Sequence, residues 1–242
     1  MIKIVPWTDR IYAVPLLLLI WGCVTTQSKQ RKVISSMFQE GKDDLVWVSE
    51  KWDDKDCLLL DGEIEKSENK MLVYSSWSED SLYLYFKVFD SDLRAYQIDQ
   101  DHSKLFLDDM VEVLLDPHND KDSCWGEDDI IYHINLFGVK KDDRGSQECQ
   151  TDPKWNGKGV ISIELRGTLN DTLDTDDGYL LSLSLPWQEI GLIPKDGLLV
   201  GVNFANGDND GKGRQLFDWV GAWPLRSPYA FGEIILQSAD KR

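Results

Sequence analysis

Eight short runs of branched and aromatic residues recur along this chain, and they constrain its fold more than any other feature. Gly, Pro, Asn or Asp bounds nearly every run, which is typical of an all-β sandwich or barrel. The predicted strands span residues 71–77, 82–89, 110–116, 130–137, 160–166, 179–186, 198–205 and 231–236. Helical periodicity is scarce, and residues 186–192 are the best candidate for a helix. We predict a single antiparallel β-sandwich, jelly-roll-like, with one short helix.

The strand predicted at residues 110–116 places a carboxylate among apolar side chains. By the two-residue period of a strand, Val111 and Val113 share one face, while Met110 and Glu112 share the other. A Glu within an apolar strand costs free energy unless it is paired, hydrogen-bonded or facing a wet groove. Glu112 is therefore a candidate site residue. The alternative is a residue on the solvent-facing side of an antiparallel sheet.

Residues 1–22 are predicted to be a signal peptide and not part of the fold. Cationic residues precede an apolar run over residues 11–21, which is shorter than the roughly 20 residues needed to span a bilayer. The run ends in Gly22 and Cys23, a pattern that resembles the lipobox of bacterial lipoproteins, in which the cysteine becomes lipidated. An ordinary signal peptide cut nearby, or an uncleaved anchor, is the alternative. We expect an exported protein whose lipid on Cys23 holds it in the bacterial cell envelope, at the outer membrane or cell surface.

The polar stretch over residues 23–40 is predicted to be a tether, and residues 41–238 to be the folded domain. The formal net charge of the chain is −17, and removing residues 1–22 takes away two positive charges and one negative charge, which leaves −18. Electrostatics does not draw such an acidic chain to nucleic acid or anionic lipid. Neutral ligands or cations are the expected partners, and no nucleic acid.

Motifs for catalysis are absent from the sequence. It contains no H-E-x-x-H, no G-x-S-x-G and no phosphate loop, and among 43 Asp and Glu no pair stands out for glycoside hydrolysis. We therefore expect no enzyme activity. Apart from Cys23 the chain has Cys57, Cys124 and Cys149, which allow at most one internal disulfide, and Cys124 with Cys149 is the more local pair.

Acidic residues gather between the predicted strands, at residues 116–122, 127–129, 142–143 and 208–210 among others. Asp208 and Asp210 offer oxygen ligands at alternate positions before Gly211, as part of a calcium loop does. The distal Glu of a complete calcium loop is missing, so a solvated acidic turn is the alternative. A structural Ca²⁺ held by Asp208 and Asp210 is the expectation to test.

The order of several motifs over residues 41–236 resembles that of the family 9 carbohydrate-binding modules. The motifs span residues 45–47, 73–86, 88–93, 109–116, 132–135, 185–191, 201–204 and 231–236. The ten tryptophans agree with the resemblance, because indole rings stack on sugars, although core packing is the alternative for each one.

The resemblance implies non-catalytic binding of a polysaccharide or oligosaccharide, in the service of carbohydrate catabolism. Related domains are often attached to xylanases and other glycoside hydrolases. In the family, two aromatic rings enclose a sugar end, and a Glu, an Arg and an Asn hold it. These positions fall here on Phe106 and Trp223, on Glu112, on His133 in place of the Arg, and on Asn135. By alternation His133 and Asn135 share a face, which Glu112 joins if its strand pairs alongside.

Two other classes of function stay open at this point. Related sandwiches bind haem b through Met with His or Lys ligands, and Met110 and His133 fit that requirement, although no C-x-x-C-H is present. The other class is a structural or partner-binding envelope lipoprotein, which would bind no polysaccharide.

Overall fold

The structure is a computed structural model, and it describes residues 32–40, 57–61, 69–211, 213–221 and 227–238. These residues belong to one compact unit, Arg31–Arg242. The predicted signal peptide, the predicted lipidation site Cys23 and the predicted stacking residue Trp223 lie outside the described residues. Among the described residues, no helix combines the length and the apolar character that crossing a membrane requires.

Strands make up nearly all the regular structure. They are β1 (Val33–Phe38), β2 (Leu58–Asp61), β3 (Lys70–Trp77), β4 (Ser81–Phe89), β5 (Met110–Asp116), β6 (Ile130–Asn135), β7 (Lys140–Ser146), β8 (Gln150–Asp152), β9 (Val160–Arg166), β10 (Gly178–Pro186), β11 (Leu199–Asp208), β12 (Gln215–Asp218) and β13 (Gly232–Gln237). The one α-helix in the described part of the chain is α2 (Trp187–Ile190), and short 3-10 helices are η3 (Leu105–Leu107), η4 (Gln147–Cys149) and η5 (Pro228–Ala230).

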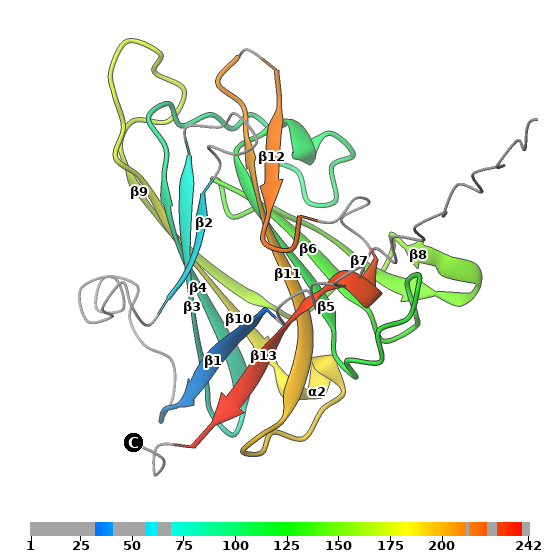
Figure 1. Cartoon of the computed structure of the whole chain (residues 1–242). Coiled ribbons are helices and arrows are strands. Elements are labelled where there is room, and N and C mark those ends of the chain that lie inside the picture. Colours follow the sequence, from blue (N-terminus) through cyan, green and yellow to red (C-terminus); the bar gives the residue numbers. More distant parts are fainter. Residues whose placement is uncertain (1–31, 41–56, 62–68, 212, 222–226, 239–242) are drawn as a thin grey trace, which may run out of the picture. The chain divides into compact units, whose positions relative to one another are not determined.

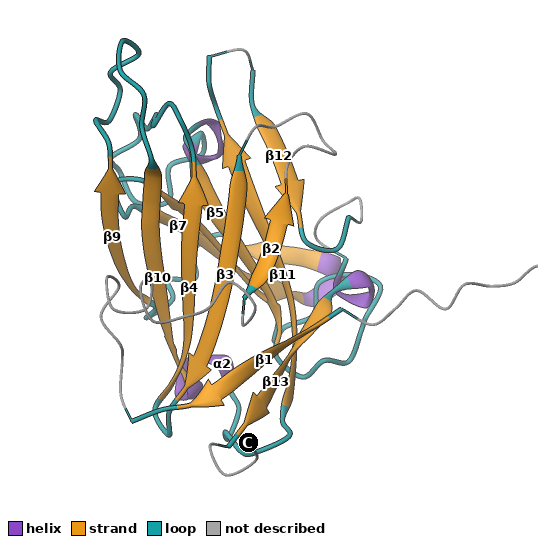
Figure 2. Ribbon diagram, turned by 60° about the vertical axis from the view of Figure 1, so that its left-hand side comes forward, coloured by secondary structure: helices purple, strands orange, loops and turns teal. Residues whose placement is uncertain are grey.

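The strands form two layers that face each other across the core. Hydrogen bonding runs in the order β8-β7-β6-β5-β11-β13-β1-β3-β4-β10-β9, with β12 added to β11 and β2 to β3. One layer contains β3, β4, β10 and β9, the other contains β11, β5, β6 and β7, and β13 with β1 connects them at one end (Figures 1 and 2). The pairings are antiparallel except that β1 runs parallel to both of its neighbours. The β-sandwich prediction is confirmed.

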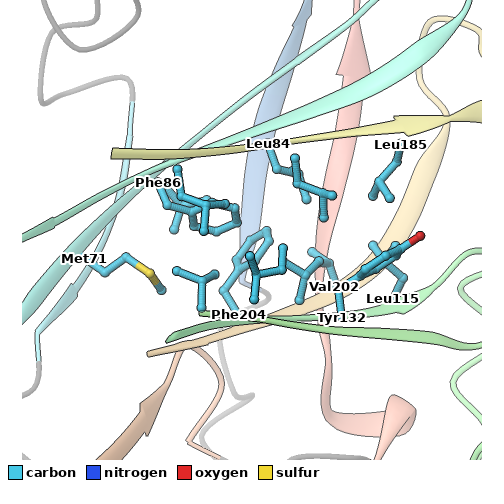
Figure 3. Close-up of a cluster of buried hydrophobic side chains, with 14 of the residues drawn as sticks. Met71, Leu84, Phe86, Leu115, Tyr132, Leu185, Val202 and Phe204 are labelled. Carbon is cyan, nitrogen blue, oxygen red and sulfur yellow. The ribbon is translucent and has the colours of Figure 1, made fainter. Parts of the chain in front are cut away.

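Apolar side chains from the two layers fill the space between them. Leu84 and Phe86 of β4 point toward Phe204 of β11 and Leu115 of β5, and all four are fully buried (Figure 3). Four tryptophans are each less than 10% exposed, namely Trp77, Trp125, Trp187 and Trp219. For these four, the alternative of packing in the interior is therefore correct. Burial of this apolar area is the main stabilising term of such a sandwich.

The predicted tether over residues 23–40 is wrong at its C-terminal end, because β1 lies within it. Ile34 of β1 is buried in the core and aligns with Ile234 of β13. The strand therefore belongs to the domain, which begins before the predicted boundary at residue 41. A six-residue strand whose partner lies about two hundred residues further on leaves no local signal beyond a weak alternation.

The chain reverses between β3 and β4 through a hydrogen bond from Ser78 N to Ser81 O, at 2.9 Å. Two local predictions are confirmed. The short helix α2 ends at Gly191, whose φ of +77° is a conformation that glycine adopts without steric cost. Cys124 and Cys149 form a disulfide. Residues 142–143, predicted to be an acidic loop, instead lie in β7.

Candidate functional site

Glu112 and His133 lie directly opposite each other on the outer face of neighbouring strands. In β5 and β6, Val113 and Tyr132 point into the core, so Glu112 and His133 point away from it. The Glu112 Oε1 atom is 3.5 Å from His133 Nδ1, and both side chains are about 95% buried. The prediction that Glu112 shares a face with His133 and Asn135 is confirmed by the register, which aligns Met110 with Asn135.

Arg214 completes this group from the segment that joins β11 to β12. Its Nη2 atom donates a hydrogen bond of 2.9 Å to Glu112 Oε1. Its guanidinium carbon lies 5.7 Å from the centre of the Phe106 ring, within cation–π range. Sequence reasoning missed Arg214, because it is 102 residues away from Glu112 along the chain. We call Phe106, Glu112, His133 and Arg214 the Glu–Arg site.

The Glu–Arg site combines an exposed ring with buried polar atoms. Phe106, in η3, is 44% exposed. Among the described residues, His133 Nδ1 and Arg214 Nε have no hydrogen-bond partner although both atoms are buried. Buried polar atoms without partners cost free energy. The two nitrogens are therefore hydrogen-bonding groups of the Glu–Arg site that no hydrogen bond within the described chain uses.

Small residues of β11 make room for Arg214. Ala205 aligns with Glu112, and Gly207 aligns with Met110. A Cβ atom on Gly207 would lie 3.1 Å from Met110 Cγ and 3.7 Å from Arg214 Nε. A Cβ at position 207 would therefore crowd the methionine and make an ordinary van der Waals contact with the guanidinium.

Asn135 does not contribute free polar atoms to the Glu–Arg site, because its amide bonds to groups of the protein itself, and its role in reading sugar hydroxyls stays a prediction. The side chain is fully buried, and its Nδ2 donates to Gln97 O at 2.7 Å and to Asp108 Oδ2 at 2.9 Å. Its Oδ1 accepts from the backbone N–H groups of Phe137 and Val139, each at 3.1 Å. Asn135 instead positions the segment that leads into η3 and Phe106.

The haem alternative finds no support in the structure. Met110 is fully buried and packs with Leu105 and Val139 in a small apolar cluster. His133 lies beside Glu112, next to the guanidinium of Arg214. The thioether of Met110 is thus enclosed by packing, so it is not placed to coordinate iron.

Three buried carboxylates meet beside the Glu–Arg site. Asp90 follows β4, Asp109 precedes β5 and Asp208 ends β11, and one oxygen from each lies within 4.8 Å of the others. Burial, with the charges of Asp208 and Asp210, raises the pKa of Asp90 to about 7. Burial, with the charge of Asp90, raises the pKa of Asp109 to about 9. We call Asp90, Asp109 and Asp208 the triple-Asp cluster. Of the two predicted calcium ligands, it includes Asp208 but not Asp210.

A second acidic group, at the opposite end of β5, has partners within the chain. Asp116 accepts hydrogen bonds from the backbone N–H groups of Asp120 and Lys121, each at 3.2 Å. Asp128 Oδ2 lies 3.1 Å from His118 Nδ1. These contacts hold the loop that follows β5.

Comparison with known proteins identifies the kind of domain. A family described as "Carbohydrate family 9 binding domain-like" matches residues 40–239. Endo-1,4-beta-xylanase A of Thermoanaerobacterium saccharolyticum is 25% identical over 203 residues, which are 81% of this chain and 15% of the xylanase. Exoglucanase XynX of Acetivibrio thermocellus is 26% identical over 139 residues, which are 57% of this chain and 11% of the exoglucanase. The chain thus spans only a small part of both relatives.

Solved structures show the same fold. A family 9 carbohydrate-binding module from Caldicellulosiruptor kristjanssonii, in complex with cellotriose, superposes with a TM-score of 0.61 at 19% identity, covering 87% of this chain and 96% of the module. The complex of a module from the same organism with glucose also has a TM-score of 0.61 at 19% identity, covering 87% of this chain and 98% of the module.

Proposed function

Because the chain belongs to the carbohydrate family 9 binding domain-like family, we propose that it binds a polysaccharide or oligosaccharide without transforming it. The observation that carries the proposal is the Glu–Arg site. An exposed aromatic ring there lies beside a buried carboxylate, an imidazole and a guanidinium. Sugars present apolar C–H faces and a rim of hydroxyls. The aromatic ring offers a surface on which a C–H face can stack, and the polar groups can hydrogen-bond the hydroxyls.

Arg214 supplies a positive charge to the Glu–Arg site, where the sequence has His133 in place of the family's Arg. The resemblance puts His133 where the family has an Arg, and the Arg214 guanidinium reaches Glu112 from another segment. A carboxylate, a guanidinium and an imidazole together can accept from and donate to neighbouring hydroxyls of one sugar. We propose Phe106 as a stacking surface and Glu112, His133 and Arg214 as the hydroxyl-binding groups.

The test is calorimetric titration of the purified domain with cello- and xylo-oligosaccharides. Phe106→Ala removes the stacking surface and should weaken binding about tenfold or more, and Arg214→Ala should do the same. Tyr229→Ala and Arg166→Ala are matched controls, because Tyr229 is an exposed aromatic in η5 and Arg166 an ion-paired arginine in β9. Both controls should bind like the wild type.

Failure to bind any oligosaccharide or polysaccharide would refute the proposal and leave the structural or partner-binding envelope protein as the better interpretation. Binding that is indifferent to Phe106→Ala and Arg214→Ala would place the sugar elsewhere on the molecule. Trp223, which is outside the described residues, then becomes the next residue to substitute.

We also propose that a lipid on Cys23 anchors the domain to the bacterial envelope. There the domain would bind glycan close to partner enzymes that act on it. The apolar run before Cys23 supports this, and so does the Cys124–Cys149 disulfide, since disulfides persist mainly outside the cytosol. Cys23→Ala should release the protein from the membrane fraction of expressing cells. A variant that stays membrane-bound with residues 1–22 attached would mean that these residues act as an uncleaved anchor.

A further inference from the structure

Strand β7 carries two ion pairs, one on each of its faces. Lys140 Nζ lies 2.8 Å from Asp142 Oδ2, and Lys141 Nζ lies 2.7 Å from Asp143 Oδ2. Successive side chains of a strand point to opposite faces, so the two pairs point in opposite directions. The Lys141–Asp143 pair is on the outer face, because Lys141 aligns with His133 of the Glu–Arg site.

The pair on the core side of β7 holds a loop. Lys140 donates a hydrogen bond to the carbonyl of Gly157, and Asp142 Oδ2 accepts one from the N–H of Gly157. The Lys140 ammonium also lies 5.5 Å from the centre of the Tyr132 ring, within cation–π range. These contacts fasten residues 153–159 to the sheet, so the fold itself explains this pair.

The Lys141–Asp143 pair has no comparable use inside the protein. Within the described chain, the Lys141 ammonium donates only to Asp143, and Asp143 Oδ1 is buried without a hydrogen-bond partner. The Asp143 side chain is 3% exposed, and that of Lys141 is 25% exposed. A buried ion pair gains little net stability, because the cost of removing two charges from water offsets their attraction. The pair therefore keeps unused donors and an unused acceptor on the outer face.

This pair continues the polar groups of the Glu–Arg site across the sheet. Strands β5, β6 and β7 lie side by side (Figure 1), and the register places Glu112 opposite His133 and His133 opposite Lys141. Arg214 ends the row beside Glu112, and Asp143 ends it beside Lys141. We call these five residues the polar row.

Apolar clusters lie on both sides of the polar row. Two residues before Glu112 in β5 is Met110, and two residues after it is Leu114, so both share its face. Met110 packs with Leu105 and Val139, whereas Leu114 packs with Trp125, Ile131 and Phe231. The polar row therefore crosses the strands as a band between two apolar clusters.

The polar row is longer than one sugar unit. Neighbouring strands are about 4.8 Å apart, so β5 and β7 are separated by about 10 Å. One pyranose ring does not span that distance, whereas a disaccharide does. At each end of the row a cation stands beside a carboxylate, and such a pair can donate to one hydroxyl of a sugar and accept from the next.

We infer that Lys141 and Asp143 form a second sugar-binding position, so that the protein binds a glycan of two or more units laid across β5, β6 and β7. The inference rests on the proposed function, because the first unit occupies the Glu–Arg site. The hydroxyls of the second unit accept hydrogen bonds from the Lys141 ammonium and donate one to Asp143 Oδ1.

Calorimetric titration with sugars of increasing length tests the second position, with glucose, cellobiose and cellotetraose in one series and xylose, xylobiose and xylotetraose in another. The wild type should bind a disaccharide about tenfold more tightly than its monosaccharide, as one hydrogen bond to a charged group would give. Lys141→Ala should lose this gain and keep its affinity for the monosaccharide within about twofold. Phe106→Ala should weaken the binding of both sugars. Lys87→Ala, which changes a lysine on the outer face of β4 in the other layer, should bind like the wild type.

A double variant guards against loss of the fold. Lys141→Ala leaves Asp143 buried without its cation, whereas Lys141→Met combined with Asp143→Asn removes both charges together. The double variant should also lose the gain for disaccharides, and melting curves show whether each variant is folded. A wild type that binds monosaccharide and disaccharide equally, or folded variants that keep the gain, would overturn the second position and leave the proposed function standing. If the wild type binds no sugar of either series, the proposed function fails and the second position fails with it.

Discussion

The hydrogen bond between Arg214 and Glu112 offers a direct test of how the Glu–Arg site is held together. Glu112 is 4% exposed, and the Arg214 side chain is 25% exposed. A hydrogen bond to a charged group contributes about 1.5–3 kcal/mol, and removing one partner of a buried pair leaves the other charge without compensation. Partial solvent access to Arg214 reduces that figure, so Arg214→Ala should lower the free energy of unfolding by about 2 kcal/mol.

A double-mutant cycle separates the pair from the rest of the arginine. Glu112→Gln keeps an acceptor near Arg214 and removes the charge, so the double variant should be less destabilised than the sum of the single variants by about 1–2 kcal/mol. Urea unfolding followed by tryptophan fluorescence gives these free energies, provided the urea dependence (the m-value) stays constant among the variants.

A matched surface pair provides the control for this cycle. Arg166 and Glu164 lie 3.8 Å apart with more than a third of each side chain exposed, and such pairs contribute little. Arg166→Ala should therefore change stability by less than about 0.5 kcal/mol. If Arg214→Ala costs no more than Arg166→Ala, or if the cycle gives no coupling, the pair is not held in a buried site and the reasoning is refuted.

Three further predictions concern buried polar groups and the disulfide. Asn135→Ala should lower the free energy of unfolding by about 3 kcal/mol, because it leaves buried donors and acceptors unpaired, and a loss below about 1 kcal/mol in urea unfolding would contradict this. Burial raises the pKa of Asp129 to about 8. Between about pH 4 and about pH 8 the folded protein therefore binds more protons than the unfolded chain. The free energy of unfolding thus falls as the pH rises through that window. Asp129→Asn should flatten this fall in urea titrations at about pH 5 and about pH 8, and an unchanged fall would argue against a raised pKa. Replacing Cys124 and Cys149 together by Ser should cost about 3 kcal/mol for a separation of 25 residues, and reduction of the wild type should reproduce that loss.

The strands that sequence patterns predict are those in which apolar residues alternate or run together. All eight such strands form, because one face of each must bury its apolar side chains. β7 could not be predicted in this way, because its sequence, Lys-Lys-Asp-Asp-Arg-Gly-Ser, contains no apolar residue to alternate. It is a strand because its backbone pairs with β6 and β8, and the buried carboxylate of Asp142 accepts from the ammonium of Lys140 at 2.8 Å and from the N–H of Gly157 at 2.5 Å. The pairing with β6 and the contact with Gly157 exist only in the folded protein.

The sequence by itself determined the class of fold and the family, and it singled out Glu112 as a candidate residue, because alternation and motif order are local properties of the chain. The tertiary structure alone decided the rest of the site. It places Arg214 within hydrogen-bond distance of Glu112, and it places Asn135 where its amide binds Asp108, the residue that follows η3. It also brings Asp90 and Asp109 close to Asp208. Each of these depends on the register between strands far apart in the chain, and register is set by the collective burial of the core, which no local pattern encodes.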